Sequence, residues 1–343
     1  MAANVFVHGY MGWGSFDIPY KAMPYWGMFT GDLLKRLRKQ GFECYSASVA
    51  PQGSAWDRAC ELYAQLAGTR TDYGAAHAAR FHHDRFGPDF TGKPIVPQWD
   101  ADHTVNLLGH SFGGPTVRYL AELLVNGHAE EALAVEDASP LFRGGQEHLL
   151  HAVVTLAGTN NGTSIMGTGM GGRPDSAEFD MTIDHAVAAS RGMRLSPDVY
   201  YFACPCCASV RQPDGTHLMD ESLTEKMLVS TGNQIGRTRG VTRLGIRVDD
   251  AWLPNDGLVN TIAAGAPLEQ PKNQLGPADV PTKEPFAGVN AADLSAGIWN
   301  VFQPYEGDHM SQMGGFFRRN KDVDHYYNEL LTLLNRLPSN AEK

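Results

Sequence analysis

A serine between two glycines is the first feature of this sequence that could do chemistry. Ser111 stands in Gly109-His110-Ser111-Phe112-Gly113, after the apolar run 105–108 and before a predicted helix. A sharp turn from strand to helix exposes a serine at the end of a sheet, and flanking glycines avoid a collision with neighbouring backbone. The pattern predicts that Ser111 is a nucleophile.

A histidine must assist this serine, because a hydroxyl is a poor nucleophile until a base takes its proton. In the α/β-hydrolase order the acid and then the histidine follow the serine. Of 13 histidines, only His309 and His325 lie in the last hundred residues. His325 stands inside a predicted helix, whereas His309 lies in a loop after a predicted strand. His309 is therefore the predicted base.

The acid that orients this histidine is predicted to be Asp256. It stands in an Asn-Asp-Gly turn after an apolar pair, which places a carboxylate on a loop. Asp249 and Asp250 remain alternatives, and their other interpretation is a capped, solvated loop. Asp308 is interpreted as a capping or solvated carboxylate.

Ester cleavage by a serine also needs two backbone N–H groups that bind the negative oxygen formed during the reaction. Phe112, directly after the serine, is the first predicted donor. Tyr10 is the second, because it follows an early apolar strand that ends at a glycine. His8 and His110 are interpreted as structural supports.

The elements that must position these residues alternate between strand and helix. Such a rhythm predicts an α/β fold with a mostly parallel sheet covered on both faces. Predicted strands are 4–9, 42–49, 104–108, 152–156, 199–203, 244–248 and 298–302, and predicted helices are 30–40, 54–66, 72–80, 117–125 and 322–337. The glycine-rich stretch 162–173 is predicted to lie over a surface, and 264–289 is predicted to be an excursion between elements.

Composition excludes several classes of function. The 343 residues carry 28 Lys and Arg against 38 Asp and Glu, a net charge of −10, which argues against nucleic acid as a partner. The sequence has no apolar run of about 18 residues, so no membrane helix is expected. The N-terminus shows no export signal, which favours the cytoplasm, or secretion if a leader precedes this sequence. The oligomeric state stays open.

Five cysteines, an odd number, do not indicate a disulfide framework. Cys204, Cys206 and Cys207 are close enough to suggest a soft-metal or redox site. Buried thiols after a strand are the favoured interpretation, because the sequence shows no second Cys or His cluster to complete a metal shell.

At this point the sequence resembles the zinc-containing bacterial lipases of the Geobacillus and staphylococcal type. The resemblance implies a single α/β-hydrolase domain over 1–343, with insertions at 50–90 and 160–240 forming a zinc-binding and a cap region. It implies ester hydrolysis with Ser111, Asp256 and His309 as the triad. The blocks that carry it are the serine turn, His8-Gly-Tyr-Met-Gly-Trp-Gly14, Trp56-Asp-Arg-Ala-Cys-Glu61, Asp72-Tyr-Gly-Ala-Ala-His77, Arg85-Phe-Gly87, Trp252-Leu-Pro-Asn-Asp-Gly257 and Asp308-His309.

The same resemblance implies a structural zinc ion. The positions that match the ligands of the family are Asp57, His77 and His83, with Asp175 chosen as the fourth. Four protein ligands leave no open catalytic position. Asp180 and Asp184 remain alternatives for the fourth ligand.

The spacing of the two zinc histidines constrains the chain. His77 and His83 are six residues apart, so on one straight helix they would point roughly 120° away from each other. The chain is therefore expected to leave the helix near Phe81. His82 is the substitute should the register shift by one.

Two departures from the family refine the expectation. Relatives continue after 157–163 into a long lid helix, whereas this chain has only a short glycine-rich stretch, 165–173. An open site for short or medium acyl esters, or for polymer chains, is expected, and 220–237 is a candidate cover. Ser311 stands where the family has a calcium-binding glutamate, so no calcium is expected.

The sequence thus predicts a serine carboxylesterase or lipase acting on an ester or lipid substrate. A polyester hydrolase is the alternative within this class. A zinc hydrolase in which the metal activates water, and a non-catalytic binding protein, are the alternatives from other classes.

Overall fold

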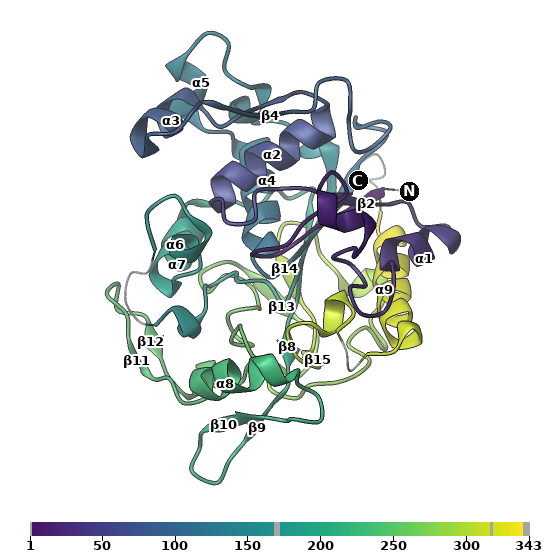
Figure 1. Cartoon of the computed structure of the whole chain (residues 1–343), viewed down its shortest axis with the longest axis vertical. Coiled ribbons are helices and arrows are strands. Elements are labelled where there is room, and N and C mark those ends of the chain that lie inside the picture. Colours follow the sequence, from purple (N-terminus) through teal and green to yellow (C-terminus); the bar gives the residue numbers. More distant parts are fainter. Residues whose placement is uncertain (1, 168–171, 316–317, 339–343) are drawn as a thin grey trace.

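The computed structural model describes residues 2–167, 172–315 and 318–338 (Figure 1). Its centre is a seven-stranded sheet in the order β13-β14-β7-β6-β5-β1-β2. Each pair of neighbours in this sheet is parallel, which confirms the predicted α/β class. The strands are β1 (Ala3–Val7), β2 (Cys44–Ala47), β5 (Val105–His110), β6 (Leu150–Leu156), β7 (Tyr200–Cys204), β13 (Lys272–Gln274) and β14 (Trp299–Val301).

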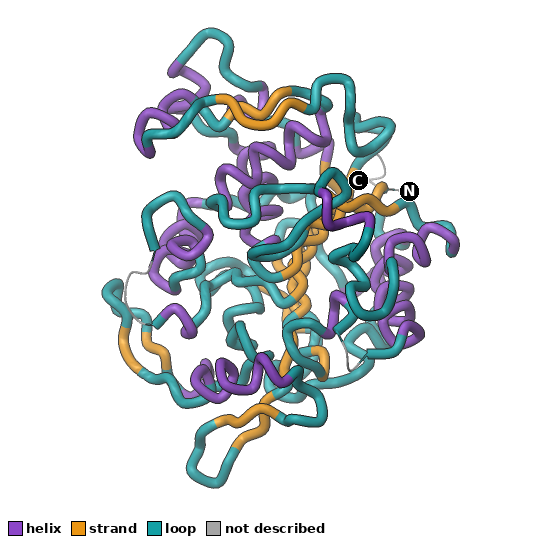
Figure 2. The backbone as a smooth tube through the Cα atoms, in the orientation of Figure 1, coloured by secondary structure: helices purple, strands orange, loops and turns teal. Residues whose placement is uncertain are grey.

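Alternating side chains of β1 divide the core into two layers. Val5 and Val7 pack in one apolar cluster with residues of α2 and α4, while Phe6 packs in a second cluster with residues of α1 and α9. Figure 2 shows the strands down the middle of the molecule, with α1 and α9 beside them. The α-helices are α1 (Leu33–Lys39), α2 (Ala55–Ala67), α3 (Ala75–Phe81), α4 (Gly113–Asn126), α5 (Ala129–Ala134), α6 (Ala177–Asp180), α7 (Ile183–Gly192), α8 (Lys226–Ile235) and α9 (Asn320–Asn335).

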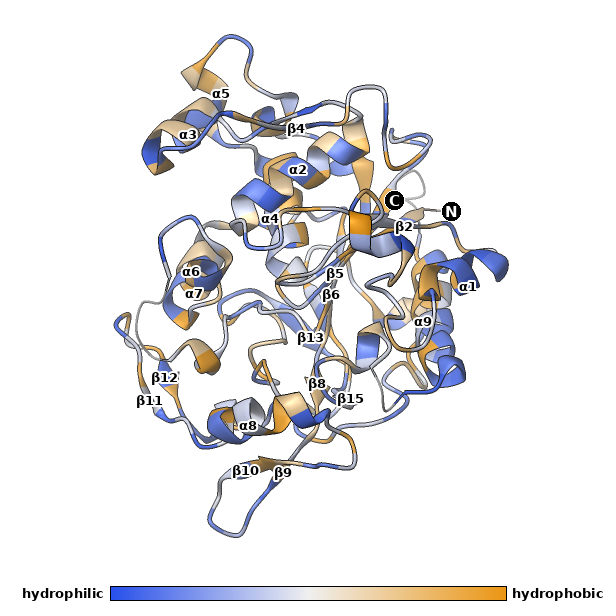
Figure 3. Ribbon diagram, in the orientation of Figure 1, coloured by the Kyte–Doolittle hydropathy of each residue, from blue (hydrophilic) through white to orange (hydrophobic). Residues whose placement is uncertain are grey.

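Each covering helix has one apolar side. In α9 the buried residues include Tyr326, Leu330 and Leu334, spaced four apart, and polar residues lie between them. This spacing places apolar side chains on one stripe of the helix. Figure 3 shows the mixture of hydrophobic and hydrophilic residues along α1, α2 and α9.

Small sheets and short helices surround this core. The small sheets pair β3 (Arg70–Asp72) with β4 (Phe86–Asp89), β9 (Ser209–Arg211) with β10 (His217–Met219), β11 (Gly240–Val241) with β12 (Arg247–Val248), and β8 (Cys206–Cys207) with β15 (Tyr305–Glu306). The 3-10 helices are Ile18–Lys21, Pro140–Arg143, Glu147–Leu149, Ser164–Met166, Asp250–Trp252, Ala291–Asp293 and Ser311–Met313. Within the described residues, no helix has the length and apolar character to cross a membrane.

Three predicted segments differ from the structure. Of 244–248, only β12 is a strand, and it pairs with β11 outside the central sheet. The predicted excursion 264–289 contains β13, the edge strand of the sheet. The range 160–240, assigned to the cap, contains the central strand β7. Of the glycine-rich stretch, residues 168–171 lie outside the described residues.

Candidate active site and metal centre

Ser111 occupies a strained turn between β5 and α4. Its φ angle is +56°, in the left-handed region that side chains rarely adopt. A Cβ atom at Gly109 would collide with the carbonyl of Gly113, and one at Gly113 would collide with the carbonyl of Val7. Both glycines are therefore required for the chain to pass from strand to helix here.

His309 and Asp256 form a buried pair. Nδ1 of His309 lies 2.8 Å from Oδ2 of Asp256, and both side chains are almost fully buried. The other carboxylate oxygen, Oδ1, accepts backbone N–H groups of Leu258 and Val259 at 3.0 and 2.8 Å. An ionised Asp256 so held keeps the proton of His309 on Nδ1, which leaves Nε2 able to accept a proton.

A chain of hydrogen bonds connects this pair to the serine turn. His110, the neighbour of Ser111, places Nε2 2.9 Å from the backbone oxygen of His309. Since a carbonyl only accepts, Nε2 carries the proton and Nδ1 accepts from Tyr25 Oη at 2.7 Å. Tyr25 Oη in turn accepts the N–H of Gly9 at 3.1 Å. Sequence reasoning identified His110 as a support and missed Tyr25, whose only signal is an aromatic-rich stretch.

The predicted oxyanion donors belong to two loops that meet at the serine. A Cβ atom at Gly9 would lie 2.7 Å from Cβ of Ser111, so only glycine permits this approach. Within the described part of the chain, neither the Tyr10 nor the Phe112 backbone N–H has a hydrogen-bond acceptor. Both N–H groups are therefore left without a protein acceptor, as the predicted role requires.

A buried arginine supports both of these loops. Arg58 has no exposed surface, and its guanidinium donates to the carbonyls of His8 and Gly9 at 2.5 and 3.4 Å. Its Cζ lies 5.0 Å from the ring centroid of Phe112. Sequence analysis missed this residue, because a charged side chain on a helix is usually solvated.

We expect two buried histidines, His8 and His110, to make a destabilising contribution in mild acid. Burial first, and then Arg58 for His8 and His309 for His110, lower the pKa of each imidazole from 6.5 to about 3. Below pH 6.5 these two histidines therefore bind protons in the unfolded chain and not in the folded chain. Their contribution to the free energy of unfolding falls as pH drops from 6.5 toward 3. The two groups together cost about 3 kcal/mol between pH 7.5 and 5.5.

Urea unfolding at pH 7.5, 6.5 and 5.5 measures this loss. In His110→Gln the loss of unfolding free energy from pH 7.5 to 5.5 should be smaller by about 1.4 kcal/mol than in the unsubstituted protein, whereas the exposed His148→Gln should leave that loss unchanged. The same pH dependence in His110→Gln and in the unsubstituted protein would contradict the assignment.

The alternative catalytic residues are engaged elsewhere. His325 pairs with Glu284 at 2.8 Å on the exposed side of α9. Asp249 caps the 3-10 helix that follows it, and Asp250 pairs with Arg239 at 2.7 Å.

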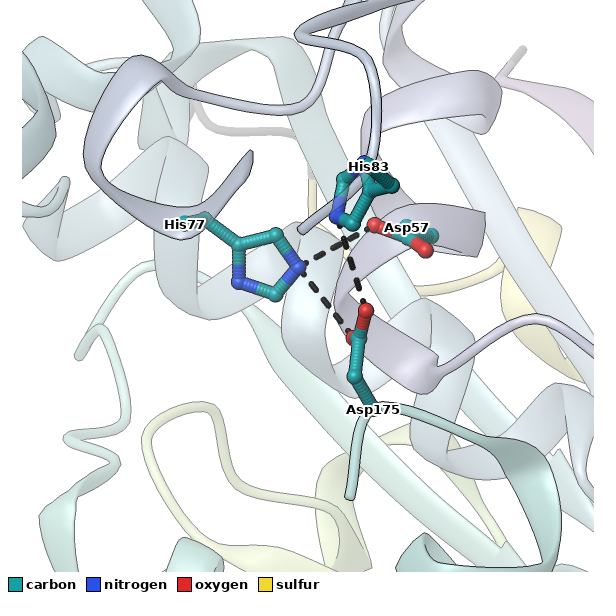
Figure 4. Close-up of side chains that lie close together, drawn as sticks. All are labelled: Asp57, His77, His83 and Asp175. Carbon is teal, nitrogen blue, oxygen red and sulfur yellow. Dashed lines mark ion pairs between the residues drawn. The ribbon is translucent and has the colours of Figure 1, made fainter. Parts of the chain in front are cut away.

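Four side chains from three distant segments converge in a second cluster (Figure 4). One ligand atom from each of Asp57, His77, His83 and Asp175 lies within 4.8 Å of the others. Nε2 of His77 is 3.2 Å from a carboxylate oxygen of each aspartate, and Nε2 of His83 is 3.5 Å from Asp175. These are the four residues that the family resemblance implies.

The donor atoms of this cluster are arranged better for binding a metal ion than for hydrogen bonding to one another. Oδ1 of Asp57 and Nε2 of both histidines are buried without a hydrogen bond. Ligands about 2.0–2.1 Å from a tetrahedral ion stand about 3.3 Å apart, close to the 3.2–3.5 Å found here. Two imidazoles and two carboxylates are ligand types that zinc accepts.

Local backbone turns bring the cluster together. The α3 helix ends at Phe81 and His82 adopts the left-handed conformation, which redirects the chain so that His83 returns beside His77. The predicted exit from the helix near Phe81 is thus confirmed, and the side chain of the substitute ligand His82 is exposed. Asp175 also has a positive φ, +64°.

Electrostatics and packing hold the first histidine of the cluster. Burial lowers the pKa of His77, but Asp175 and Asp57 outweigh it and raise the pKa to about 9 in the metal-free protein. The ring stacks on Trp56 at 5.0 Å, and Glu131 accepts the backbone N–H of His77 at 2.6 Å.

The other aspartates considered as ligands have different partners. Asp180 accepts the N–H of Ala55 at 2.7 Å and pairs with His185, and Asp184 accepts the N–H of Leu244.

The cysteines are free and buried. Among the residues that the structure describes, none of them joins a group of three or more metal-ligating side chains. This agrees with the interpretation of Cys204, Cys206 and Cys207 as buried thiols.

Comparisons with known proteins find lipases and an esterase among the similar chains. Residues 2–172 match the family model described as "Lipase-like, C-terminal domain". Lipase 2 of Staphylococcus aureus is 29% identical over 401 aligned positions, which cover 99% of this chain and 54% of that protein. The chain thus spans about half the length of the curated relatives it matches.

Two solved structures resemble the whole chain. EstA from Clostridium botulinum superposes with a TM-score of 0.83 at 28% identity, covering all of this chain and 88% of the other. The lipase of Staphylococcus hyicus also gives a TM-score of 0.83, at 26% identity, covering 97% and 95%. The fold is therefore α/β-hydrolase-like.

Proposed function

The chain belongs to the bacterial lipase family of the staphylococcal type, and on that premise we propose that it is a serine-dependent carboxylic ester hydrolase. The observation that carries the proposal is the buried His309–Asp256 pair, joined through His110 to the turn of Ser111. Serine, histidine and aspartate perform acyl transfer when the imidazole stands between the hydroxyl and the carboxylate.

In the first half of the reaction, Oγ of Ser111 attacks the ester carbonyl carbon and Nε2 of His309 takes the hydroxyl proton. The N–H groups of Tyr10 and Phe112 bind the negative oxygen, and Asp256 stabilises the imidazolium. The intermediate then collapses: the bond to the leaving alkoxide breaks, the alkoxide takes the proton from His309, and an acyl-serine remains.

Water completes the cycle. His309 takes a proton from a water molecule while the oxygen of that water attacks the acyl carbon. The second intermediate then releases the carboxylic acid, and the oxygen of Ser111 takes the proton back from His309. Atoms balance as one ester and one water giving one alcohol and one acid.

We further propose that Asp57, His77, His83 and Asp175 hold a zinc ion. A four-ligand zinc ion supplies a structural link and no open position for water, so the catalytic steps belong to Ser111 and its partners. The single domain 1–343 would then carry the segment 50–90 as a zinc-binding addition and parts of 160–240 as a cap.

The substrate range proposed is short to medium acyl esters, with polyesters as the alternative. A series of p-nitrophenyl esters from acetate to palmitate, run beside a polyester film, measures it. Falling kcat/KM beyond medium chains supports the first choice, and release of soluble fragments from the film supports the second.

A serine-reactive phosphonate tests the nucleophile. We expect one phosphonyl group per chain, located on the peptide that contains Ser111, and loss of esterase activity in proportion to labelling. Full labelling with unchanged activity, or labelling of a different serine, would contradict the proposal.

A further inference from the structure

A cavity of about 600 Å³ lies apart from both sites. It is lined by residues of the β9–β10 hairpin, of the loop 250–268, of the edge strand β13 and of its neighbour β14. None of Ser111, Asp256, His309 and the four proposed zinc ligands lines it. Figure 1 shows β9 and β10 at the bottom of the molecule, away from α3 and the metal cluster. Its volume is in the range of small-molecule sites.

The wall of this cavity is largely apolar and partly exposed. Val210 and Leu268 both line it, and their exposed fractions are 52% and 39%. Ala251, Ala278 and Pro281 add further small apolar surface. Apolar side chains gathered around a hollow, rather than scattered singly, are typical of a ligand site.

Polar groups converge at one part of the wall. Oγ of Ser209 lies 3.3 Å from Nδ1 of His217 and 3.8 Å from Sγ of Cys207, and all three residues line the cavity. A few polar atoms in an apolar hollow fix the orientation of a ligand that has one polar end.

The charged residues around the cavity indicate the charge of the polar end of the ligand. Arg211 and Lys272 line the cavity, and neither forms an ion pair with any described residue. Of the two acidic lining residues, Asp250 is already paired with Arg239, which leaves Asp279. On a chain with a net charge of −10, two such cations around an apolar hollow favour an anion.

We propose that this cavity binds a medium-chain carboxylate, with the acyl chain against the apolar wall and the carboxylate toward Arg211 and Lys272. The site is separate from the catalytic one, and its binding does not depend on the proposed function. If the proposed function holds, ester hydrolysis supplies this class of ligand.

The cavity also shares its wall with the loops that carry the catalytic pair. Oγ of Ser209 accepts the backbone N–H of Asn255, next to Asp256, at 3.0 Å. Cys207 accepts the backbone N–H of Gly307, two residues before His309, at 3.0 Å. A bound carboxylate would therefore touch residues that hold both loops.

Calorimetric titration of the Ser111→Ala variant of the 343-residue chain with decanoate tests the proposal without turnover. We expect saturable binding of one decanoate, weaker by about tenfold for octanoate because two methylenes are lost. Decanol should bind more weakly than decanoate. Arg211→Glu with Lys272→Glu should weaken decanoate binding by roughly tenfold.

Matched variants locate the ligand. Ala278→Trp places a large side chain in the cavity wall and should abolish binding. Two controls change exposed residues outside the cavity, namely Ala292→Trp and the double variant Lys21→Glu with Lys93→Glu. Both controls should leave the affinity for decanoate unchanged. The absence of saturable binding, or an affinity that is the same in the cavity variants as in the parent chain, would overturn the proposal. Melting curves of each variant confirm that it is folded.

Discussion

Ser111→Ala is expected to lower kcat for p-nitrophenyl butyrate by about 10⁴-fold or more, equivalent to about 5.5 kcal/mol of transition-state stabilisation. Alanine has no oxygen to attack the ester, so the acyl-enzyme cannot form. The remaining rate reflects the N–H donors of Tyr10 and Phe112. Stopped-flow and steady-state assays of the two proteins measure the difference.

The same variant should remain folded. Alanine meets the same backbone strain at φ +56° as serine, and the side chain loses only one hydroxyl. We expect the Tm to change by no more than about 2 °C. Ser230→Ala, on the exposed side of α8, is the matched control and should keep full activity. Esterase activity that survives in Ser111→Ala and disappears with a chelator would favour the zinc hydrolase instead.

Removal of the metal is expected to lower the Tm by about 6 °C. The ion would join α2, the end of α3 and the segment after residue 172, and without it three buried donor atoms lack hydrogen bonds. A ligand present at a thousand times its Kd stabilises the folded state by about 4 kcal/mol, and a chain of 343 residues melts about 1.4 °C lower for each kcal/mol lost. Calorimetry before and after chelation measures the shift.

Add-back and variants make this test specific to the four residues. Restoring zinc should restore the Tm, and elemental analysis should find one zinc per chain. Asp175→Asn and His77→Ala should have a lowered Tm that the chelator does not change further. His82 is exposed beside the cluster, so His82→Ala should show the same Tm and the same response to the chelator as the unsubstituted protein. A Tm that is unchanged by chelation, or a full equivalent of zinc in Asp175→Asn, would refute the site.

Local features were predictable because neighbouring residues determine them. The long strands β1, β5 and β6 follow from largely apolar runs, and the serine turn follows from five consecutive residues. The edge strand β13 was missed because its three residues, Lys272–Gln274, are polar and hydrogen bond to only one neighbouring strand. The prediction for 244–248 was wrong because most of that run belongs to a tight hairpin.

The resemblance to a family identified the candidate zinc ligands, which the spacing of the residues could not do. Two histidines six apart do not share a helix face, and only the left-handed turn at His82 brings His83 back to His77. Asp175 was one of three open choices, and it is the one whose carboxylate lies 3.2 Å from His77. The identity of the ion stays a prediction.

By itself, the sequence determined the alternation of the longer strands and helices, the glycine-flanked serine and the choice of His309 and Asp256 as candidates, because periodicity and turn chemistry act over a few residues. Tertiary structure alone decided that these two side chains meet at 2.8 Å, that Tyr25 and His110 connect them to the serine turn, and that Arg58 contacts the loops that carry Tyr10 and Phe112. The reason is that each of these contacts joins segments far apart in the chain. Their distances depend on how whole loops pack against the sheet, which no local pattern encodes.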